Sequence, residues 1–198
     1  MIQNRLRGPI TALISPLAKF LLKIGVTPNA ITAFGAIGAS VSAIYFFARG
    51  DFFIGTVAVT LFVLSDLFDG TMARLSESGS TPWGALIDST LDRIADAAIF
   101  IGVLFFAYDS QETLLSYLTI YCLITGGLIP YIRAKAESLG IPCSVGIAER
   151  TERLVLVLIG TGLYGLGVDY ALIAILFVIA ILSTITVAQR LLIVSRAK

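Results

Sequence analysis

The sequence contains no histidine and only two cysteines, and charged residues make up just 14% of its 198 residues. Without histidine, a Ser-His-Asp hydrolytic triad and the usual histidine-containing zinc sites are excluded. A general base must therefore be a carboxylate or a rarer group. Cys122 and Cys143 have no metal-ligand spacing, so we expect two free thiols. The formal net charge is only +1, and we expect no nucleic-acid partner.

Long apolar runs take the place of the missing charges, and hydrophobic residues make up 57% of the chain. Each uncharged run is close to the roughly 20 residues that a helix needs to cross a bilayer. The three purest runs are Ile31 to Ala48, Thr113 to Ile132 and Tyr170 to Gln189, and the three less pure ones are Phe52 to Ser65, Ala97 to Tyr108 and Leu154 to Val168. Because these runs are continuous rather than alternating, we predict an all-α integral membrane protein with six transmembrane helices.

The basic residues are distributed unevenly across this six-span arrangement. Thirteen of the fourteen fall on one side, and Arg49 alone falls on the other. By the positive-inside rule that side is cytoplasmic and holds both termini and the active site. No cleavable signal peptide is visible, so we expect the mature chain to start near Met1.

Residues 1–26 predict an amphipathic helix that lies on the cytoplasmic leaflet, and residues 27–198 then form the six-helix membrane domain. A partly disordered leader is the alternative for the first segment. Thr27 and Pro28 are a suitable cap and first-turn pair for the first span. The apolar positions of the first segment, which share one helical face, are Ile10, Leu13, Ile14, Leu17, Leu21 and Ile24.

Four aspartates interrupt the apolar sequence in a regular pattern. Asp66 and Asp69 are three residues apart and Asp88 and Asp92 are four apart, so each pair shares one helix face. Acids gathered in a low dielectric repel and become protonated unless cations lie between them. Oxygen ligands without histidine or cysteine favour magnesium, manganese or calcium over zinc.

Small residues accompany these acids and leave room for a bulky ligand. Gly70 and Ala73 follow Asp69, and Gly84 precedes Asp88 by one turn. A phosphate-bearing substrate fits this arrangement, because Arg74 is a bidentate phosphate donor. Tight helix packing, with the acids paired to Arg74 and Arg93, is the alternative. We expect Asp96, one turn beyond Asp92, to pair with a neighbouring polar group.

The full pattern Asp66-x2-Asp69-Gly70-x2-Ala73-Arg74-x9-Gly84-x3-Asp88-x3-Asp92 resembles the signature of the CDP-alcohol phosphotransferase family. The resemblance implies an enzyme of the bacterial cell membrane that moves a phosphatidyl group from CDP-diacylglycerol to an alcohol and releases CMP. It implies two Mg2+ or Mn2+ ions held by the four aspartates, with Asp92 as the proton acceptor. It also implies a homodimer.

The same resemblance implies a nucleotide site near the acids. Asn29 and Thr32, which open the first span, could equally be capping groups. The residues implied for CDP-diacylglycerol are Asn29, Thr32, Asp66, Asp69, Gly70, Ala73, Arg74 and Gly84.

Basic residues around the predicted loop from Arg133 to Arg153 suggest a second, anionic substrate. Ordinary positive-inside flanking is the alternative. The segments Tyr131 to Glu137, Glu149 to Arg153 and Gln189 to Leu191 resemble the bacterial phosphatidylinositol phosphate synthases within the family. This resemblance implies inositol phosphate as the acceptor, bound by Arg133, Lys135, Arg153 and Arg190.

Two other functions fit parts of the pattern. A phosphatidylglycerophosphate synthase would share the signature and take glycerol phosphate, which is also anionic. A divalent-cation transporter could use the four acids as a transport site. The grouping of Asp and Arg toward one face, with no acids continuing through the outer half, argues against transport.

Overall fold

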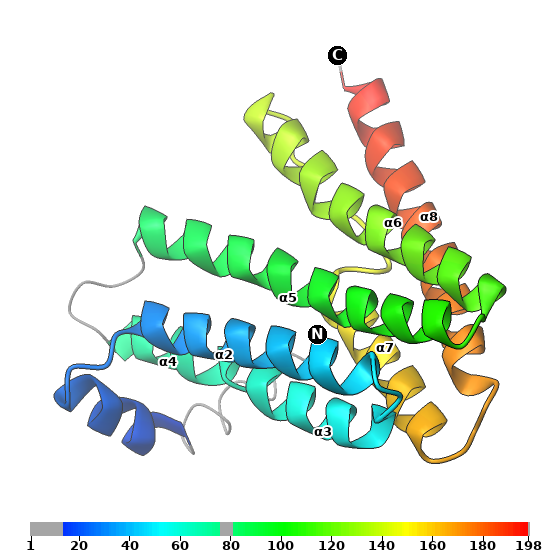
Figure 1. Ribbon diagram of the computed structural model, residues 1–198. Coiled ribbons are helices and arrows are strands. Elements are labelled where there is room, and N and C mark those ends of the chain that lie inside the picture. Colours follow the sequence, from blue (N-terminus) through cyan, green and yellow to red (C-terminus); the bar gives the residue numbers. More distant parts are fainter. Residues whose placement is uncertain (1–13, 76–80, 198) are drawn as a thin grey trace.

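The computed structural model describes residues 14–75 and 81–197, except for the side chains of Asp66, Leu67 and Asp69. Within these ranges the chain forms helices and no strands, as the apolar runs predict. Residues 14–23 form a first helix. The later helices are α2 (Pro28–Ser42) with its π-helical continuation η1 (Ala43–Phe47), α3 (Phe52–Val63), α4 (Asp66–Leu75), α5 (Pro82–Asp109), α6 (Thr113–Ser138), α7 (Arg150–Gly165) and α8 (Ala171–Arg196) (Figure 1).

The two helices that begin nearest the candidate site start with the same local device. Thr27 caps α2 by accepting a hydrogen bond from the Ala30 amide at 3.2 Å, which confirms the predicted Thr27–Pro28 pair. Thr81 caps α5 in the same way, with the Gly84 amide at 3.0 Å and Pro82 in the first turn. Proline is favourable at this position because its missing amide hydrogen would have had no helical partner.

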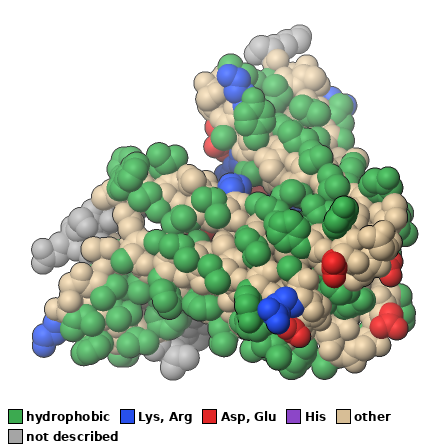
Figure 2. All heavy atoms as spheres, in the orientation of Figure 1, with side chains coloured by type: hydrophobic (Ala, Val, Ile, Leu, Met, Phe, Trp, Pro, Cys, Tyr) green, Lys and Arg blue, Asp and Glu red, His purple; other side chains and the backbone are tan. Residues whose placement is uncertain are grey.

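Three of the helical segments are long and apolar enough to cross a membrane. They are Pro28–Phe47, Thr113–Ser138 and Ala171–Arg196. The surface of the protein suits a lipid environment, since large side chains such as Phe34, Leu61 and Tyr117 are each more than 60% exposed. Figure 2 shows hydrophobic side chains spread over much of the visible face. The other three predicted spans coincide with α3, α5 and α7, and their passage through a bilayer stays a prediction.

The helix over residues 14–23 uses its apolar side chains in two directions. Ile14 and Ala18 are buried against Met72 of α4, whereas Leu17 and Phe20 are about half exposed. The predicted single apolar face is therefore divided between packing and exposure, because α4 covers one side of the helix. Ile10 and Leu13 lie outside the described residues. Binding of this helix to the leaflet stays a prediction.

Helix α5 is the central element of the arrangement. It packs against α2 and η1 on one side and against α6 on another, while α8 packs against α6 and α7, and α3 packs against α2 and α7 (Figure 1). An aromatic cluster joins several of these elements where the short connections lie. The Phe52 ring is centred 4.8 Å from Phe106 and 4.9 Å from Tyr164. Aromatic pairs at these separations stabilise a core beyond the area they bury.

Several glycines allow the helices to approach each other closely. A Cβ atom at Gly102 of α5 would collide with the carbonyl oxygen of Ala43 in η1. Cβ atoms at Gly35, Gly38 and Gly55 would likewise collide with Ser65, Phe62 and Phe47. These small residues serve packing within one chain, so they provide no argument for a dimer interface.

Substitution of Gly102 tests the close contact between α5 and η1. We expect Gly102→Ala to lower the midpoint of thermal unfolding in detergent, because a backbone carbonyl cannot move aside and overpacking costs about 1–3 kcal/mol. The matched control is Gly127→Ala in α6, where a Cβ atom meets no described residue within 4 Å. Equal midpoints for the two variants would contradict the packing described here.

Candidate active site

The four signature aspartates lie on two helices that share one neighbour. Asp66 and Asp69 are on α4 and Asp88 and Asp92 are on α5, and both helices pack against α2. The side chains of Asp66 and Asp69 lie outside the described part of the chain. Asp88 is exposed, and the Asp92 side chain is 18% exposed. Among the described side chains no group of three acids, cysteines or histidines forms a metal site, so the four-carboxylate centre stays a prediction.

The chemistry of these donors suits hard divalent cations. The signature supplies carboxylate oxygens, and the chain has no histidine to compete with them. Magnesium and manganese prefer such oxygen ligands. In the structure Asp92 is already paired with a cation, because its Oδ1 lies 2.8 Å from Nη2 of Arg150. Asp92 therefore lies where a guanidinium group of the chain, that of Arg150, supplies positive charge.

The residues predicted to bind the nucleotide occupy the start of α2, the whole of α4 and the start of α5. A Cβ atom at Gly84 would lie 3.0 Å from Oδ1 of Asn29, so α2 and α5 meet closely there. Thr32 is buried and donates to the Pro28 carbonyl at 3.2 Å. Neither Asn29 nor Thr32 caps α2, because Thr27 does so.

On α4 the small predicted residues border open space. Among the described side chains, a Cβ atom at Gly70 would have only Arg74 Nη1 within 4 Å, at 3.9 Å. Arg74 is exposed and donates to Thr71 Oγ1 at 3.1 Å, and Ala73 is half-buried. The nucleotide roles of these residues stay predictions.

A polar cavity of about 330 Å³ brings together arginines from four helices. We call it the arginine cavity. Its basic lining residues are Arg93 of α5, Arg133 of α6, Arg150 and Arg153 of α7, and Arg190 of α8. The cavity also has two acidic lining residues, Glu137 and Glu149. Four carboxylates oppose the five guanidinium groups, namely the two lining glutamates together with Asp92 and Asp96, which pair with Arg150. A surplus of one positive charge remains, which suits an anionic ligand.

The arginine cavity includes three of the four residues predicted for the acceptor. Arg133, Arg153 and Arg190 line it, whereas Lys135 is exposed and lines neither cavity of the site. Two further lining residues are Arg93, which the sequence did not link to the acceptor, and Arg150, which belongs to the basic cluster but was not predicted to bind the acceptor. The position of Arg93, directly after the signature residue Asp92, could have indicated that Arg93 lies near the acceptor site. Arg133 and Arg153 do not lie in a loop, because α6 continues to Ser138 and α7 begins at Arg150.

Two of these arginines are buried and hold the connection between α6 and α7. Arg190 is 2% exposed, donates its Nε to the Val145 carbonyl at 2.8 Å, and also donates to the Ile129 carbonyl. Arg153 donates to the Ala148 carbonyl at 2.9 Å. Buried guanidinium groups are thus satisfied by backbone carbonyls, as low-dielectric surroundings require.

Thr186 of α8 holds the same connection from a second point. Its Oγ1 accepts from the amides of Ile147 and Ala148 at 3.2 and 3.0 Å. Thr186 therefore helps to fix the segment that leads directly into Arg150 and Arg153 of α7.

Arg133 differs from the buried arginines in its access to solvent. Its side chain is 44% exposed, and it forms an ion pair with Glu137 of the same helix at 2.9 Å. Such an exposed pair within one helix contributes little to stability. Arg133 can therefore turn toward a ligand at small cost.

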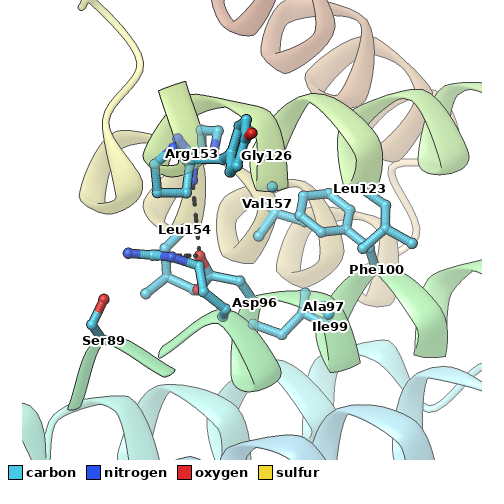
Figure 3. A pocket seen from close by; sticks show the side chains of 14 residues that line it. Ser89, Asp96, Ala97, Ile99, Phe100, Leu123, Gly126, Arg153, Leu154 and Val157 are labelled. Carbon is cyan, nitrogen blue, oxygen red and sulfur yellow. Dashed lines mark ion pairs between the residues drawn. The ribbon is translucent and has the colours of Figure 1, made fainter. Parts of the chain in front are cut away.

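A second cavity of about 330 Å³ adjoins the first (Figure 3). We call it the apolar cavity, since its walls include Phe100, Leu123, Leu154 and Val157. Four residues line both cavities, namely Ser89, Arg93, Pro130 and Arg153. A polar and an apolar chamber that share a wall suit a ligand with a charged head and a hydrocarbon portion.

Asp96 and Arg150 connect the signature acids to the arginine cavity. Arg150 reaches Asp92 with Nη2 and Asp96 with Nε, at 2.8 and 3.2 Å. Arg93 and Arg153 also lie within 3.8 Å of the Asp96 carboxylate. The expectation that Asp96 pairs with a polar neighbour is confirmed. The two cysteines are free, as predicted, and both are buried.

Known proteins resemble the chain over nearly its whole length. A model of the CDP-alcohol phosphatidyltransferase family matches residues 25–187. The phosphatidylinositol phosphate synthase of Streptomyces avermitilis is 42% identical, covering 99% of this chain and 83% of that protein. The synthase of the same name from Corynebacterium glutamicum is 36% identical, covering 96% of this chain and 88% of that protein.

Two solved structures of the Mycobacterium tuberculosis phosphatidylinositol phosphate synthase are also similar. One has CDP-DAG bound, with a TM-score of 0.89 and 38% identity over 93% of this chain and 94% of that one. The other is a complex with manganese and citrate, with a TM-score of 0.87 and 37% identity over 92% of this chain and 89% of that one.

The different surroundings of Arg190 and Arg133 predict different effects on stability. Arg190→Gln leaves buried carbonyl groups without donors, at a cost of about 1–3 kcal/mol for each unsatisfied group. Arg133→Gln removes an exposed pair, which is worth about 0.2–1 kcal/mol. Thermal unfolding in detergent should therefore show a clearly lower midpoint for Arg190→Gln alone. Similar midpoints for the two variants would show that Arg190 does not hold the connection between α6 and α7.

Proposed function

Because the chain belongs to the CDP-alcohol phosphatidyltransferase family, it is an enzyme of that class, and we propose that it is a phosphatidylinositol phosphate synthase. It transfers the phosphatidyl group of CDP-diacylglycerol to inositol phosphate and releases CMP. The observation that carries this proposal is the arginine cavity, which lies beside Asp92 through the Arg150 bridge. The names of the similar synthases and the CDP-DAG complex of one of them support it.

The charge of the arginine cavity supports a phosphorylated acceptor. Guanidinium groups bind phosphate through paired hydrogen bonds, and they are more weakly hydrated than an ammonium group. A neutral alcohol such as free inositol or serine would leave the positive surplus unused. In the proposal Arg133, Arg153 and Arg190 bind the acceptor phosphate, together with Arg93 and Arg150. Lys135 lies outside the cavity, where it attracts the anionic acceptor toward the site.

The reaction proposed for this site is one displacement at phosphorus. A hydroxyl oxygen of the acceptor bonds to the phosphorus that carries diacylglycerol, and the bond from that phosphorus to the CMP oxygen breaks. CMP departs with the electron pair, and Asp92 accepts the proton of the attacking hydroxyl. Asp92 is suited to this role because it is mostly buried and is held by Arg150 at the edge of the arginine cavity.

Divalent cations complete the proposed site. Asp66, Asp69, Asp88 and Asp92 would hold two Mg2+ or Mn2+ ions, which supply positive charge against the diphosphate and the departing CMP. The manganese complex of a similar synthase supports this assignment. The residues proposed to line the nucleotide, besides Asp66 and Asp69, are Asn29, Thr32, Gly70, Ala73, Arg74 and Gly84. The open space beside Gly70 and the close approach of Asn29 to Gly84 support their placement.

The proposed topology follows from the apolar helices and the distribution of charge. Six spans place both termini and the active site on the cytoplasmic side of the bacterial cell membrane, with residues 1–26 on its surface and residues 27–198 in the bilayer. The three long apolar helices support a membrane domain. A homodimer is proposed from the family resemblance alone.

The acceptor can be identified by a comparison of four alcohols. Purified protein in detergent with CDP-diacylglycerol and Mg2+ should release CMP with inositol phosphate and not with glycerol phosphate, free inositol or serine. Specific release with glycerol phosphate would keep the chemistry and overturn the acceptor. Family membership and the names of the similar synthases do not favour that alternative, and they argue against a cation transporter.

Asp92→Asn tests the proposed proton acceptor. An amide cannot take the proton, so CMP release with inositol phosphate should fall by about 10²–10⁴-fold, the usual contribution of general acid-base catalysis. Binding of CDP-diacylglycerol, measured by isothermal titration, should stay within about threefold of the unaltered protein, because Asp66, Asp69 and Asp88 remain to hold the cations. Asp109→Asn, an exposed acid at the other end of α5, is the matched control. Near-normal turnover of Asp92→Asn would rule out the assignment.

A further inference from the structure

The Asp96 carboxylate is contacted by three arginines from two helices. Arg150 Nε lies 3.2 Å from Oδ1, and Arg93 Nη1 and Arg153 Nη2 each lie 3.8 Å from Oδ2. The Asp96 side chain is 19% exposed. Figure 3 shows Asp96 directed toward Arg153, with the ion pair drawn between them. A single acid on α5 is therefore the common partner of three cations.

The position of Asp96 relative to the two cavities indicates how it acts. Arg93, Arg150 and Arg153 all line the arginine cavity, but Asp96 does not. Asp96 lines the apolar cavity instead. Its carboxylate is thus not part of the lining of the arginine cavity, although it pairs with three arginines that are. It can fix their positions without occupying the space of an acceptor phosphate.

Arg150 shows the consequence of this placement most clearly. Asp96 engages its Nε, and the Nη2 of the same guanidinium engages Asp92. A guanidinium is a planar group with donors in a fixed fork, so fixing one edge determines where the other donors point. The orientation of Arg150 at Asp92 therefore depends on Asp96, one helical turn away.

We propose that Asp96 is a positioning residue that determines how tightly the enzyme binds its anionic acceptor. It holds Arg93, Arg150 and Arg153 in the orientation that receives a phosphate group. A ligand then meets guanidinium groups that are already ordered, so less rotamer freedom is lost on binding. This inference rests on the proposed function, because the acceptor phosphate is assigned to the arginine cavity there.

A different role for the Asp96 carboxylate, that of a simple counter-ion, predicts the opposite change in the KM for the acceptor. If Asp96 were only a counter-ion, its removal would increase the positive potential of the cavity and lower the KM for a phosphorylated acceptor. If Asp96 positions the arginines, its removal frees their side chains and raises that KM. The direction of the change therefore separates the two roles.

The experiment measures CMP release against inositol phosphate concentration at saturating CDP-diacylglycerol. Three variants are compared with the unaltered protein: Asp96→Asn, Asp96→Glu, which keeps the charge but shifts it by one methylene, and the control Asp109→Asn. We expect Asp96→Asn to raise the KM for inositol phosphate by about tenfold, in line with loss of hydrogen bonds between charged groups. Asp96→Glu should recover part of this loss, and Asp109→Asn should match the unaltered protein. The KM for CDP-diacylglycerol should change by less than about twofold, because the three arginines lie on the acceptor side of the site, and kcat should fall by less than the KM for inositol phosphate rises, because Arg150 also holds Asp92.

A lowered or unchanged KM for inositol phosphate would overturn the proposal in favour of a counter-ion. Equal losses in kcat and in both KM values would show a structural role. If Asp96→Asn is not recovered as folded protein by gel filtration, Asp96→Glu decides the question by the same criterion: a KM for inositol phosphate raised at least threefold supports positioning, and a smaller change overturns it.

Failure of the proposed function can be told apart from failure of this inference. If the unaltered protein releases no CMP with inositol phosphate, the function is wrong, and titration calorimetry with inorganic phosphate tests the positioning role directly. Weaker binding to Asp96→Asn by about tenfold would support it. Equal or tighter binding, or no binding to the unaltered protein, would overturn it.

Discussion

Pairing of opposite charges between α5 and α7 is the interaction on which the site depends. A bundle with so many exposed apolar side chains can hold aspartates and arginines in its interior only if each charge finds a partner, because unpaired buried charge is strongly destabilising. Arg150 meets this requirement for Asp92 and Asp96 together. The same contacts place the first turn of α7, and with it the arginine cavity, directly beside the signature acid Asp92.

The connection between α6 and α7 is held by two arginines that also form part of the candidate site. Arg153 and Arg190 donate to its carbonyl groups, and Thr186 accepts from its amides. Both arginines also line the arginine cavity. Groups fixed by buried backbone contacts give a ligand a preformed surface, whereas Arg133, held only by an exposed pair, can adjust to it. The cavity thus combines fixed and adaptable positive charge.

The sequence predicted those features that depend on one helix at a time. Continuous apolar runs predicted the helices, and the Thr27–Pro28 pair predicted the start of α2. The extension of α6 to Ser138 was missed, because Ala134 to Glu137 are good helix formers that a hydropathy pattern does not detect. Arg93 and Arg150 were not predicted as acceptor-binding residues for a different reason: they come together through ion pairs with Asp96 that join α5 to the start of α7. For Lys135, spacing alone did not show that its side of α6 faces away from the cavity.

The proposed function depends most on binding of the acceptor phosphate in the arginine cavity, beside Asp92. The most direct measurement is a structure of the protein with inositol phosphate and Mg2+. We expect the acceptor phosphate to lie within hydrogen-bonding distance of at least two of the five cavity arginines, with a hydroxyl of the inositol ring next to Asp92. A phosphate bound elsewhere, with the five arginines still engaged only by carboxylates and carbonyls of the chain, would contradict it.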